Sequence, residues 1–396
     1  MSAVPIDLPT ERANPFDPPP ELARLRGTEP LHPLRYPDGH VGWLVTSHQL
    51  ARQVLADPRF SARAELIRSP VARPGADPFL GEPALPGWFI DMDRPDHTRL
   101  RRAFAGQFTA RRIDALRPRI EQIVVEQIDA MRAVGPPADL VESFALPVPS
   151  LVICELLGVP YADRAAFQRH STTLFSLDSS ADDATAAMAD LTTYLLDLIR
   201  AKRDHPQDDL LSRLADTDDM SEMELAGAGV LLLTAGHETV ASMLGLGVYL
   251  LLCRPDLAKR LRAEPSTVDG VTEELLRYLT IFHFGVPRTP LEDVELAGQT
   301  LRAGQCVTIS LPAANRDPAR FERPDELDPE RSGPRHLAFG YGIHQCLGQH
   351  LARIELRVGY AALLRSFPQL RLAVPPETIA TGGAGFYHVH RLPVTW

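Results

Sequence analysis

A lone cysteine, Cys346, lies in the glycine-rich stretch AFGYGIHQCLGQ, residues 338–349, directly before an apolar helical pattern. Gly340, Gly342 and Gly348 carry no side chains, so a bulky, flat group could approach the backbone there. The unpaired N–H groups of a helix start favour a thiolate over a thiol. We therefore interpret Cys346 as a thiolate ligand to a large planar cofactor such as haem, with a buried free cysteine as the alternative.

Two other kinds of site do not fit this stretch. A zinc site needs further cysteines or histidines at regular spacing, and the four cysteines, at positions 154, 253, 306 and 346, lie far apart and form no CxxC pair. A dinucleotide-binding loop needs a glycine three residues after Gly342, where this chain has Gln345. The wide cysteine spacing also favours a reduced, cytosolic protein without disulfides.

The stretch AGHET, residues 235–239, interrupts a long apolar run with polar groups. We expect its glycine, Gly236, to loosen one helical turn and Thr239 to bond back to a carbonyl in place of the helix ladder. The result would be a local widening that presents the Glu238 carboxyl beside a hydroxyl. A buried polar pair satisfied by neighbouring helices is the alternative. HExxH zinc chemistry is excluded, because Ala241 stands where the second histidine would be.

Two charged pairs have helical spacing. Glu274 and Arg277 are three residues apart, a spacing that by itself indicates an ordinary surface ion pair. His97 and Arg101 are four apart and share one helix face. Buried carboxylates on a cofactor would need such cationic partners, while the alternative for each is a solvated surface charge.

The stretch from Phe339 to Gly348 matches the FGxGxHxCxG haem-binding signature without a mismatch, and the sequence thereby resembles the cytochrome P450 family. The likeness continues in AGHET, in the ExxR pair Glu274–Arg277, in HTRLR at residues 97–101 and in the NRDP segment at 315–318, in the family's order. The resemblance implies a P450 fold that is α+β and mostly α, with haem b buried between a long central helix and the helix after the cysteine. It implies that Cys346 is the axial ligand of the haem iron.

The resemblance also assigns the other site residues. Glu238 and Thr239 become the acid–alcohol pair that delivers protons to dioxygen. Glu274 and Arg277 join Arg331 in a structural network that fixes the cysteine-bearing loop. The other haem contacts that it implies are His97, Arg101, Ala235, Gly236, Arg288, Phe339, Gly340, His344 and Gly348. The substrate pocket that it implies contains Phe79, Trp88, Leu231, Leu232, Ala235, His283, Phe284, Val286 and Phe386.

The activity implied is that of a monooxygenase that inserts one oxygen atom from O2 into a C–H bond or an alkene of a lipophilic small molecule. Tailoring of a secondary metabolite such as a macrolide or polyketide is the expected role. A peroxide-driven or non-oxygenating haem-thiolate enzyme and a haem gas sensor are the alternatives. The chain shows no flavin domain or iron–sulfur cysteine cluster, so we expect electrons from NAD(P)H through an external ferredoxin and its reductase. A basic cluster, Arg99, Arg102, Arg111 and Arg112, is the expected docking face.

Composition bounds the other possibilities. The chain has 396 residues, 44% of them hydrophobic, and a net charge of −10, which gives no global reason to expect nucleic acid as a partner. The N-terminus lacks the pattern of a signal peptide. The apolar run 225–252 is long enough to span a membrane, but a carboxylate near its middle favours a buried core helix. We expect a cytoplasmic monomer without membrane contact.

The hydrophobic periodicity predicts one domain over residues 1–396, with an irregular, proline-rich segment at 1–30. A hairpin is expected at 31–47, followed by a helix that Ser47 caps, and a second hairpin at 291–311. A long loop is expected at 69–90, a loop at 312–338, and short strands in the last thirty residues. The expected helices are 97–105, 109–132, 138–156, 161–176, 182–204, 221–253, 255–278 and 347–367.

Overall fold

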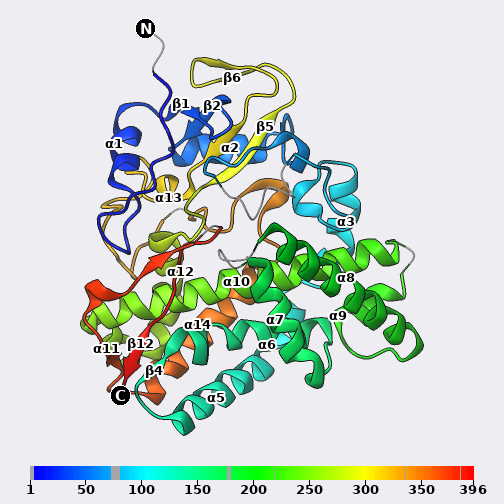
Figure 1. Ribbon diagram of the computed structural model, residues 1–396. Helices are drawn as coiled ribbons and strands as arrows, with labels where there is room; N and C mark the ends of the chain where they lie inside the picture. Colours follow the sequence, from blue (N-terminus) through cyan, green and yellow to red (C-terminus); the bar gives the residue numbers. More distant parts are fainter. Residues whose placement is uncertain (1–3, 73–80, 176–179, 218, 334, 384) are drawn as a thin grey trace.

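A long helix, α10 (Glu222–Cys253), crosses the middle of the molecule (Figure 1). Ser221 starts it with a capping box, in which Ser221 and Glu224 bond each other's backbone N–H groups. The helix is apolar on every side, as expected of a helix surrounded by protein. Its most apolar window has a mean hydropathy that would suit a membrane span, yet 72% of that window is buried inside the fold. The expected core helix is therefore present.

The other helices pack around α10 in the computed structural model, which describes residues 4–72, 81–175, 180–217, 219–333, 335–383 and 385–396. The helices α6, α8 and α14 contact α10 directly, and α5 packs against α14. The bounds are α1 Pro20–Thr28, α2 His48–Ala56, α3 Asp96–Ala105, α4 Ala110–Ala115, α5 Arg117–Val134, α6 Pro147–Leu157, α7 Arg164–Phe175, α8 Ala181–Asp204, α9 Leu210–Ala215, α11 Pro255–Ala263, α12 Val268–Leu279, α13 Leu311–Ala314 and α14 Gln349–Ser366.

The largest sheet lies beside the helical part and combines two distant segments of the chain (Figure 1). Its strand order is β1-β2-β8-β5-β3, with β2 parallel to β8 and the other pairs antiparallel. Smaller sheets have the orders β4-β12-β9, β6-β7 and β10-β11. The bounds are β1 Leu31–Arg35, β2 Val41–Val45, β3 Phe60–Ser61, β4 Ala138–Asp139, β5 Val286–Pro290, β6 Val294–Leu296, β7 Gln299–Leu301, β8 Val307–Ile309, β9 Arg371–Leu372, β10 Thr381–Gly382, β11 His388–Val389 and β12 Pro393–Thr395.

Both predicted hairpins are confirmed as β1–β2 and β6–β7, and the Ser47 side chain caps α2. Several boundaries were wrong, mostly where a proline starts a new helix. The predicted helix 109–132 divides into α4 and α5, 255–278 into α11 and α12, and 138–156 into β4, a π-helical turn at Val141–Ala145 and α6. The segment 1–30 is not wholly irregular, because α1 buries Leu22 and Leu25 against the sheet side. The short helix α9 was not predicted.

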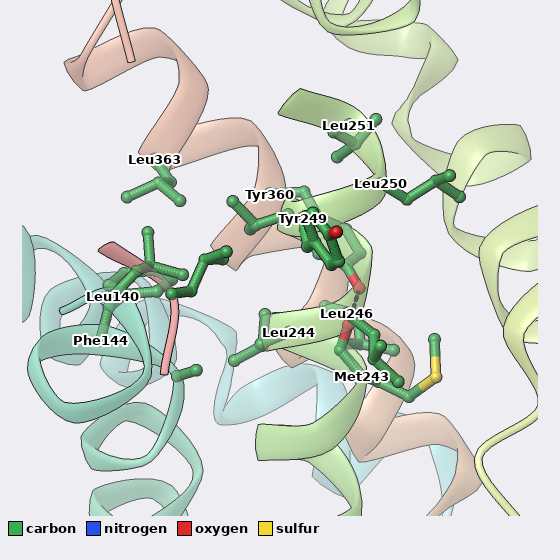
Figure 2. Close-up of a cluster of buried hydrophobic side chains, with 14 of the residues drawn as sticks. Leu140, Phe144, Met243, Leu244, Leu246, Tyr249, Leu250, Leu251, Tyr360 and Leu363 are labelled. Atoms are coloured by element: carbon green, nitrogen blue, oxygen red, sulfur yellow. Dashed lines mark hydrogen bonds between the residues drawn. The ribbon is translucent and has the colours of Figure 1, made fainter. Parts of the chain in front are cut away.

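A tyrosine on α14 fixes how closely α14 approaches α10. Tyr360 is completely buried and donates a 2.5 Å hydrogen bond from its hydroxyl to the backbone oxygen of Met243 (Figure 2). The ring lies against Gly247, where a Cβ would stand 2.1 Å from the Tyr360 hydroxyl. A glycine at this position therefore lets the helix that follows Cys346 contact the helix that carries Thr239.

The Gly247 contact predicts a position-specific cost. Gly247→Ala should lower the free energy of unfolding by about 1–3 kcal/mol, because the added methyl overpacks a completely buried ring. Gly245→Ala is the matched control on the same helix, since its Cβ would meet the nearest atom, Val141 Cγ2, at 3.8 Å. It should leave stability unchanged or raise it by up to about 1 kcal/mol through helix propensity. Urea unfolding of both variants measures this; equal stabilities would contradict the packing argument.

Candidate functional site

Cys346 lies in the loop between a short 3-10 turn, Gly342–His344, and the start of α14. Its backbone N–H donates a 2.9 Å bond to the Phe339 oxygen, which closes the loop on itself. A Cβ on Gly340 or Gly348 would meet nothing within 4 Å, so both glycines border open space as predicted. Gly342 does not, because its Cβ would lie 2.2 Å from the Leu55 backbone oxygen. That glycine lets the loop pack against α2, and its predicted role beside the flat group was wrong.

The protonation of Cys346 reflects opposing effects. Burial raises the pKa of the Cys346 thiol, while the backbone amides of Gly348 and Gln349 and the guanidiniums of Arg101 and Arg353 lower it. Burial is the larger effect, so the N–H groups at the helix start favour the thiolate as predicted but do not by themselves bring the pKa below its ordinary value. A bound metal ion deprotonates a coordinating thiol outright, and these four groups would then stabilise the negative sulfur.

The central helix α10 is partly exposed at the predicted stretch, residues 235–239, and buried on both sides of it. Residues 225–234 and 240–251 are buried, whereas Ala235 is exposed and Gly236, Glu238 and Thr239 are half-buried. The α-helix is continuous here, so the predicted widening is absent. The bare face of Gly236 is covered by Ile153, at 3.1 Å from an added Cβ. We call this partly exposed segment, residues 235–239 of an otherwise buried and continuous helix, the window of α10.

The polar groups of this window differ in direction and ionisation. The Thr239 hydroxyl donates a 2.6 Å bond to the Ala235 oxygen, and Ser242 donates at 2.7 Å to the Glu238 oxygen. Burial raises the pKa of the Glu238 carboxyl to about 7, so this group is a mixture of acid and carboxylate at neutral pH. Burial lowers the pKa of His237 to about 4, although a hydrogen bond to the Leu146 oxygen favours the charged form. This imidazole is therefore neutral, and its hydrogen bond is directed to the end of the π-helical turn.

Four cationic or basic side chains gather from three separate segments. His97 and Arg101 come from α3, Arg288 from β5 and His344 from the turn before Cys346. The imidazole centroids of His97 and His344 are 4.2 Å apart. Burial lowers the pKa of His97 to about 4 and that of His344 to about 2, and the charges of Arg101 and Arg288 lower both further. Arg101 also donates to the Gln345 oxygen beside the cysteine.

Several nitrogens in and beside this cluster have no hydrogen-bond partner among the described residues. Both ring nitrogens of His97, Nδ1 of His344 and Nε1 of Trp88 are buried without a hydrogen-bond partner there. Arg288 is buried, donates at 2.7 Å to the Pro287 oxygen, and its pKa falls to about 10 through burial. Buried polar atoms in proteins are nearly always satisfied. A cofactor that carries two carboxylates, as haem does, would satisfy this cluster, so the residues present fit the group.

The predicted structural network is confirmed in geometry. Arg277 donates at 2.7 and 2.8 Å to the two carboxylate oxygens of Glu274, and Arg331 donates to the same carboxylate at 3.1 Å. Arg277 also donates to the backbone oxygens of Asn315, Pro324 and Glu326. The pair is 2% and 4% exposed, far from the surface ion pair that spacing alone suggested.

The predicted pocket residues fall into two groups. His283, Phe284, Val286 and Phe386 lie together: His283 stacks on Phe284 at 3.7 Å and bonds the Gly383 oxygen at 2.9 Å. Leu231 and Leu232 lie in the packed core, with 2% and 8% of each residue exposed, and their place in the substrate pocket stays a prediction. Trp88 is half-buried against the same core, and Phe79 lies outside the described residues.

A cavity of about 940 Å³ reaches the site from its charged side. Arg288 and His344 line it together with Asp91, Arg94 and other charged residues. It includes none of the predicted apolar pocket residues. The cavity therefore borders the cluster of His97, Arg101, Arg288 and His344 and not the predicted substrate pocket. Burial raises the pKa of Asp91 to about 6, and the Arg288 charge opposes that rise.

Sequence reasoning missed two further supports of the cysteine loop. The Asn315 side chain donates at 2.9 Å to Thr280 Oγ1 and accepts the Leu337 N–H at 2.6 Å, which ties the loop to the end of α12. Arg353 lies 4.5 Å over the Phe339 ring and bonds Glu273 at 2.6 Å. The NRDP segment marked Asn315 as noteworthy but not its partners.

One member of the predicted docking cluster has a carboxylate partner. Arg99 forms an ion pair with Glu224 at the start of α10 and donates to the Asp219 oxygen. Arg102, Arg111 and Arg112 are exposed on α3 and α4, as Arg99 is. Because Glu224 offsets the charge of Arg99, the docking proposal below uses the other three arginines.

Comparison with known proteins agrees with this geometry. A sequence model of the family described as "Cytochrome P450" matches residues 44–382. The chain is 46% identical to Cytochrome P450-SU2 of Streptomyces griseolus, over 99% of this chain and 97% of the relative. It is 44% identical to the vitamin D3 dihydroxylase of the same species, over 98% and 96%.

A solved structure is similar over the whole chain. The LnmA cytochrome P450 hydroxylase from the leinamycin biosynthetic pathway of Streptomyces atroolivaceus superposes with a TM-score of 0.88 at 41% identity, over 100% of both chains. Together with the signature loop around Cys346, these likenesses show that this chain belongs to the cytochrome P450 family of haem-dependent monooxygenases.

Proposed function

We propose that Cys346 holds the iron of haem b and that the enzyme tailors a lipophilic secondary metabolite, such as a macrolide or polyketide, by hydroxylation or epoxidation. The observation that carries the site assignment is that both ring nitrogens of the buried His97 and Nδ1 of the half-buried His344 lack hydrogen-bond partners among the described residues, close to Arg101 and Arg288. The relation to the LnmA hydroxylase of a biosynthetic pathway supports the substrate class. We propose a monomer in the cytoplasm, with no membrane or nucleic-acid partner.

The protein's residues would have three tasks: to hold the two carboxylates of the haem, to border its ring, and to move protons. His97, Arg101, Arg288 and His344 would hold the two carboxylates, with Phe339, Gly340 and Gly348 close to the ring plane on the cysteine side. Ala235, and the backbone of Gly236, whose bare face packs on Ile153, would border the ring plane on the other side. When bound, haem supplies the activation of dioxygen, with electrons from NAD(P)H through a ferredoxin and its reductase.

Glu238 and Thr239 would handle protons at the window of α10. A carboxyl with a pKa of about 7 can release a proton and recover it from solvent at neutral pH. The Thr239 hydroxyl, already donating to the Ala235 oxygen, keeps its lone pairs free to accept a hydrogen bond. His283, Phe284, Val286 and Phe386 would form the substrate wall.

The ligand assignment predicts a spectroscopic result. Reduced wild-type protein with carbon monoxide should give a strongly red-shifted Soret band, and Cys346→Ala should lose it, because the thiolate is its source. Cys253→Ala, at the end of α10, is the matched control and should keep the band. A globin-like band in the wild type would indicate a neutral ligand and favour a gas sensor.

The proton assignment predicts a pH profile. Product formation by the wild type should decline as pH rises through about 7, because the acid form of Glu238 is lost. Glu238→Gln should form product roughly 100-fold more slowly and lose this pH dependence. The raised pKa of Glu238 also means that burying its charged form lowers the free energy of unfolding of the wild type above the unfolded pKa, near 4.5. Glu238→Gln does not carry this cost, so its stability relative to the wild type should increase as pH rises from about 4.5 to 7. Glu222→Gln, at the start of α10, where the half-buried Glu222 pairs with Arg200 and Arg203, is the control. An identical profile in it and Glu238→Gln would contradict the role.

The basic face predicts how electrons arrive. We propose that an acidic ferredoxin docks on Arg102, Arg111 and Arg112. Reversing Arg102 and Arg112 to Glu should raise the ferredoxin concentration for half-maximal turnover about tenfold, most strongly at low salt, and leave substrate affinity unchanged. Arg371→Glu, on exposed β9, should have no effect. Equal turnover in all three proteins would place the docking face elsewhere.

A further inference from the structure

The N-terminal strap, residues 12–17, connects two parts of the molecule that lie far apart in the sequence. The Arg12 guanidinium carbon lies 3.7 Å from the centroid of the Tyr387 ring. Its Nη1 donates at 2.8 Å to the Asp17 backbone oxygen, and the Phe16 ring lies 4.7 Å from that of Tyr249 on α10. The strap therefore touches both the central helix and the hairpin β10–β11.

One end of the strap is anchored in the rigid interior. Asp17 accepts a 2.9 Å bond from the Tyr278 hydroxyl on α12 and a 3.2 Å bond from Arg316. The Arg316 side chain is only 1% exposed and also pairs with Asp325. Because these partners belong to the loop and helix that support the cysteine loop, Asp17 gives the strap a fixed base.

The other end reaches the proposed substrate wall. The Tyr387 hydroxyl bonds Thr381 at 2.6 Å across the hairpin, and the Tyr387 N–H donates at 2.8 Å to the Ile281 oxygen. The next residue back, Phe386, meets Phe282 edge-on at 5.0 Å. The Tyr387 ring thus lies at the junction of the hairpin and the turn 281–284, the two segments that carry Phe386, His283 and Phe284.

The chemistry of Arg12 makes this contact specific. Arg12 Nη2 is buried and has no hydrogen-bond partner among the described residues, so the face of Tyr387 is the main compensation for its charge on that side. Burial lowers the pKa of Arg12 to about 10, which leaves the guanidinium charged at neutral pH. A partly desolvated cation over an aromatic ring is held more strongly than one in water.

We propose that Arg12 is a positioning residue for the substrate pocket: its guanidinium on Tyr387 holds the hairpin of residues 381–389 in place, and so sets how large a lipophilic molecule the pocket accepts. This inference rests on the proposed function, because it takes the segments of Phe386 and His283 as the substrate wall. The N-terminal strap then controls specificity without touching substrate.

The test compares three variants of the full, haem-loaded protein. Arg12→Met keeps an unbranched side chain as far as the position of Nε but removes the guanidinium, Arg12→Lys keeps a cation, and Arg24→Met removes an exposed arginine that pairs with Glu21 on α1. Arg12→Met should speed backbone hydrogen exchange in residues 381–389 about tenfold relative to wild type. Arg12→Lys should restore most of the protection, and Arg24→Met should change nothing.

Two azole probes of different size measure the pocket. Ketoconazole fills a large volume, whereas imidazole fills little, and both give a spectral shift on binding haem iron. Arg12→Met should weaken ketoconazole binding about tenfold and leave imidazole binding unchanged. Unchanged exchange at 381–389, equal weakening of both azoles, or no rescue by Arg12→Lys would each overturn the inference.

The failure of the proposed function would look different. It would show as a missing thiolate-type band or missing azole shift in the wild type itself, which the carbon monoxide spectrum detects before any variant is compared. The exchange measurement would still report whether Arg12 holds the hairpin. Equal thermal midpoints of Arg12→Met and wild type would show that the effect is local and not a loss of fold.

Discussion

A buried guanidinium joins the helical part of this enzyme to the loop that carries its cysteine. Arg277 is paired in bidentate fashion with Glu274, and its remaining donors go to three backbone oxygens in residues 315–326. Removal of one partner of such a pair leaves an uncompensated buried charge, a cost of about 3–5 kcal/mol. The path of the loop is therefore prescribed by α12, and Asn315 extends the same constraint to the segment just before the signature.

Around this ion pair, closely packed helices lie next to a site where buried polar atoms lack partners among the described residues. Tyr360 and Gly247 bring α14 against α10 with no space left, whereas the window at residues 235–239 stays open in the same helix. Three buried nitrogens of His97 and His344 have no hydrogen-bond partner among the described residues. Since buried polar groups in proteins are nearly always satisfied, these nitrogens mark a place that a cofactor would complete.

Local patterns in the sequence predicted the site well, because its chemistry depends on residue types at short spacing. The signature around Cys346, the ExxR pair and the paired positions 97 and 101 all need only a few neighbouring residues to be recognised. The failures involve partners that are distant in the sequence. Gly342 packs against the Leu55 backbone oxygen, unlike Gly340 and Gly348, and this difference cannot be recognised from the residues around it.

The same reason explains the other errors. The loosened turn expected at Gly236 is not seen: α10 is continuous there, and Ile153 lies 3.1 Å from where a Cβ on Gly236 would stand. Helix boundaries failed at prolines that begin a new helix instead of ending the pattern, as at Pro147, where α6 begins inside the predicted helix 138–156.

The mixed sheet has a consequence for how the protein is made. Strand β2 pairs in parallel with β8, Trp43 opposite Val307, and β3 pairs with β5, Phe60 opposite Pro290. During synthesis the N-terminal hairpin emerges long before these partners do. The helices from α3 to α12 are translated before these partners, and an open strand edge invites association with other chains. Completion of this sheet therefore comes late in synthesis, after most of the helical part has been translated.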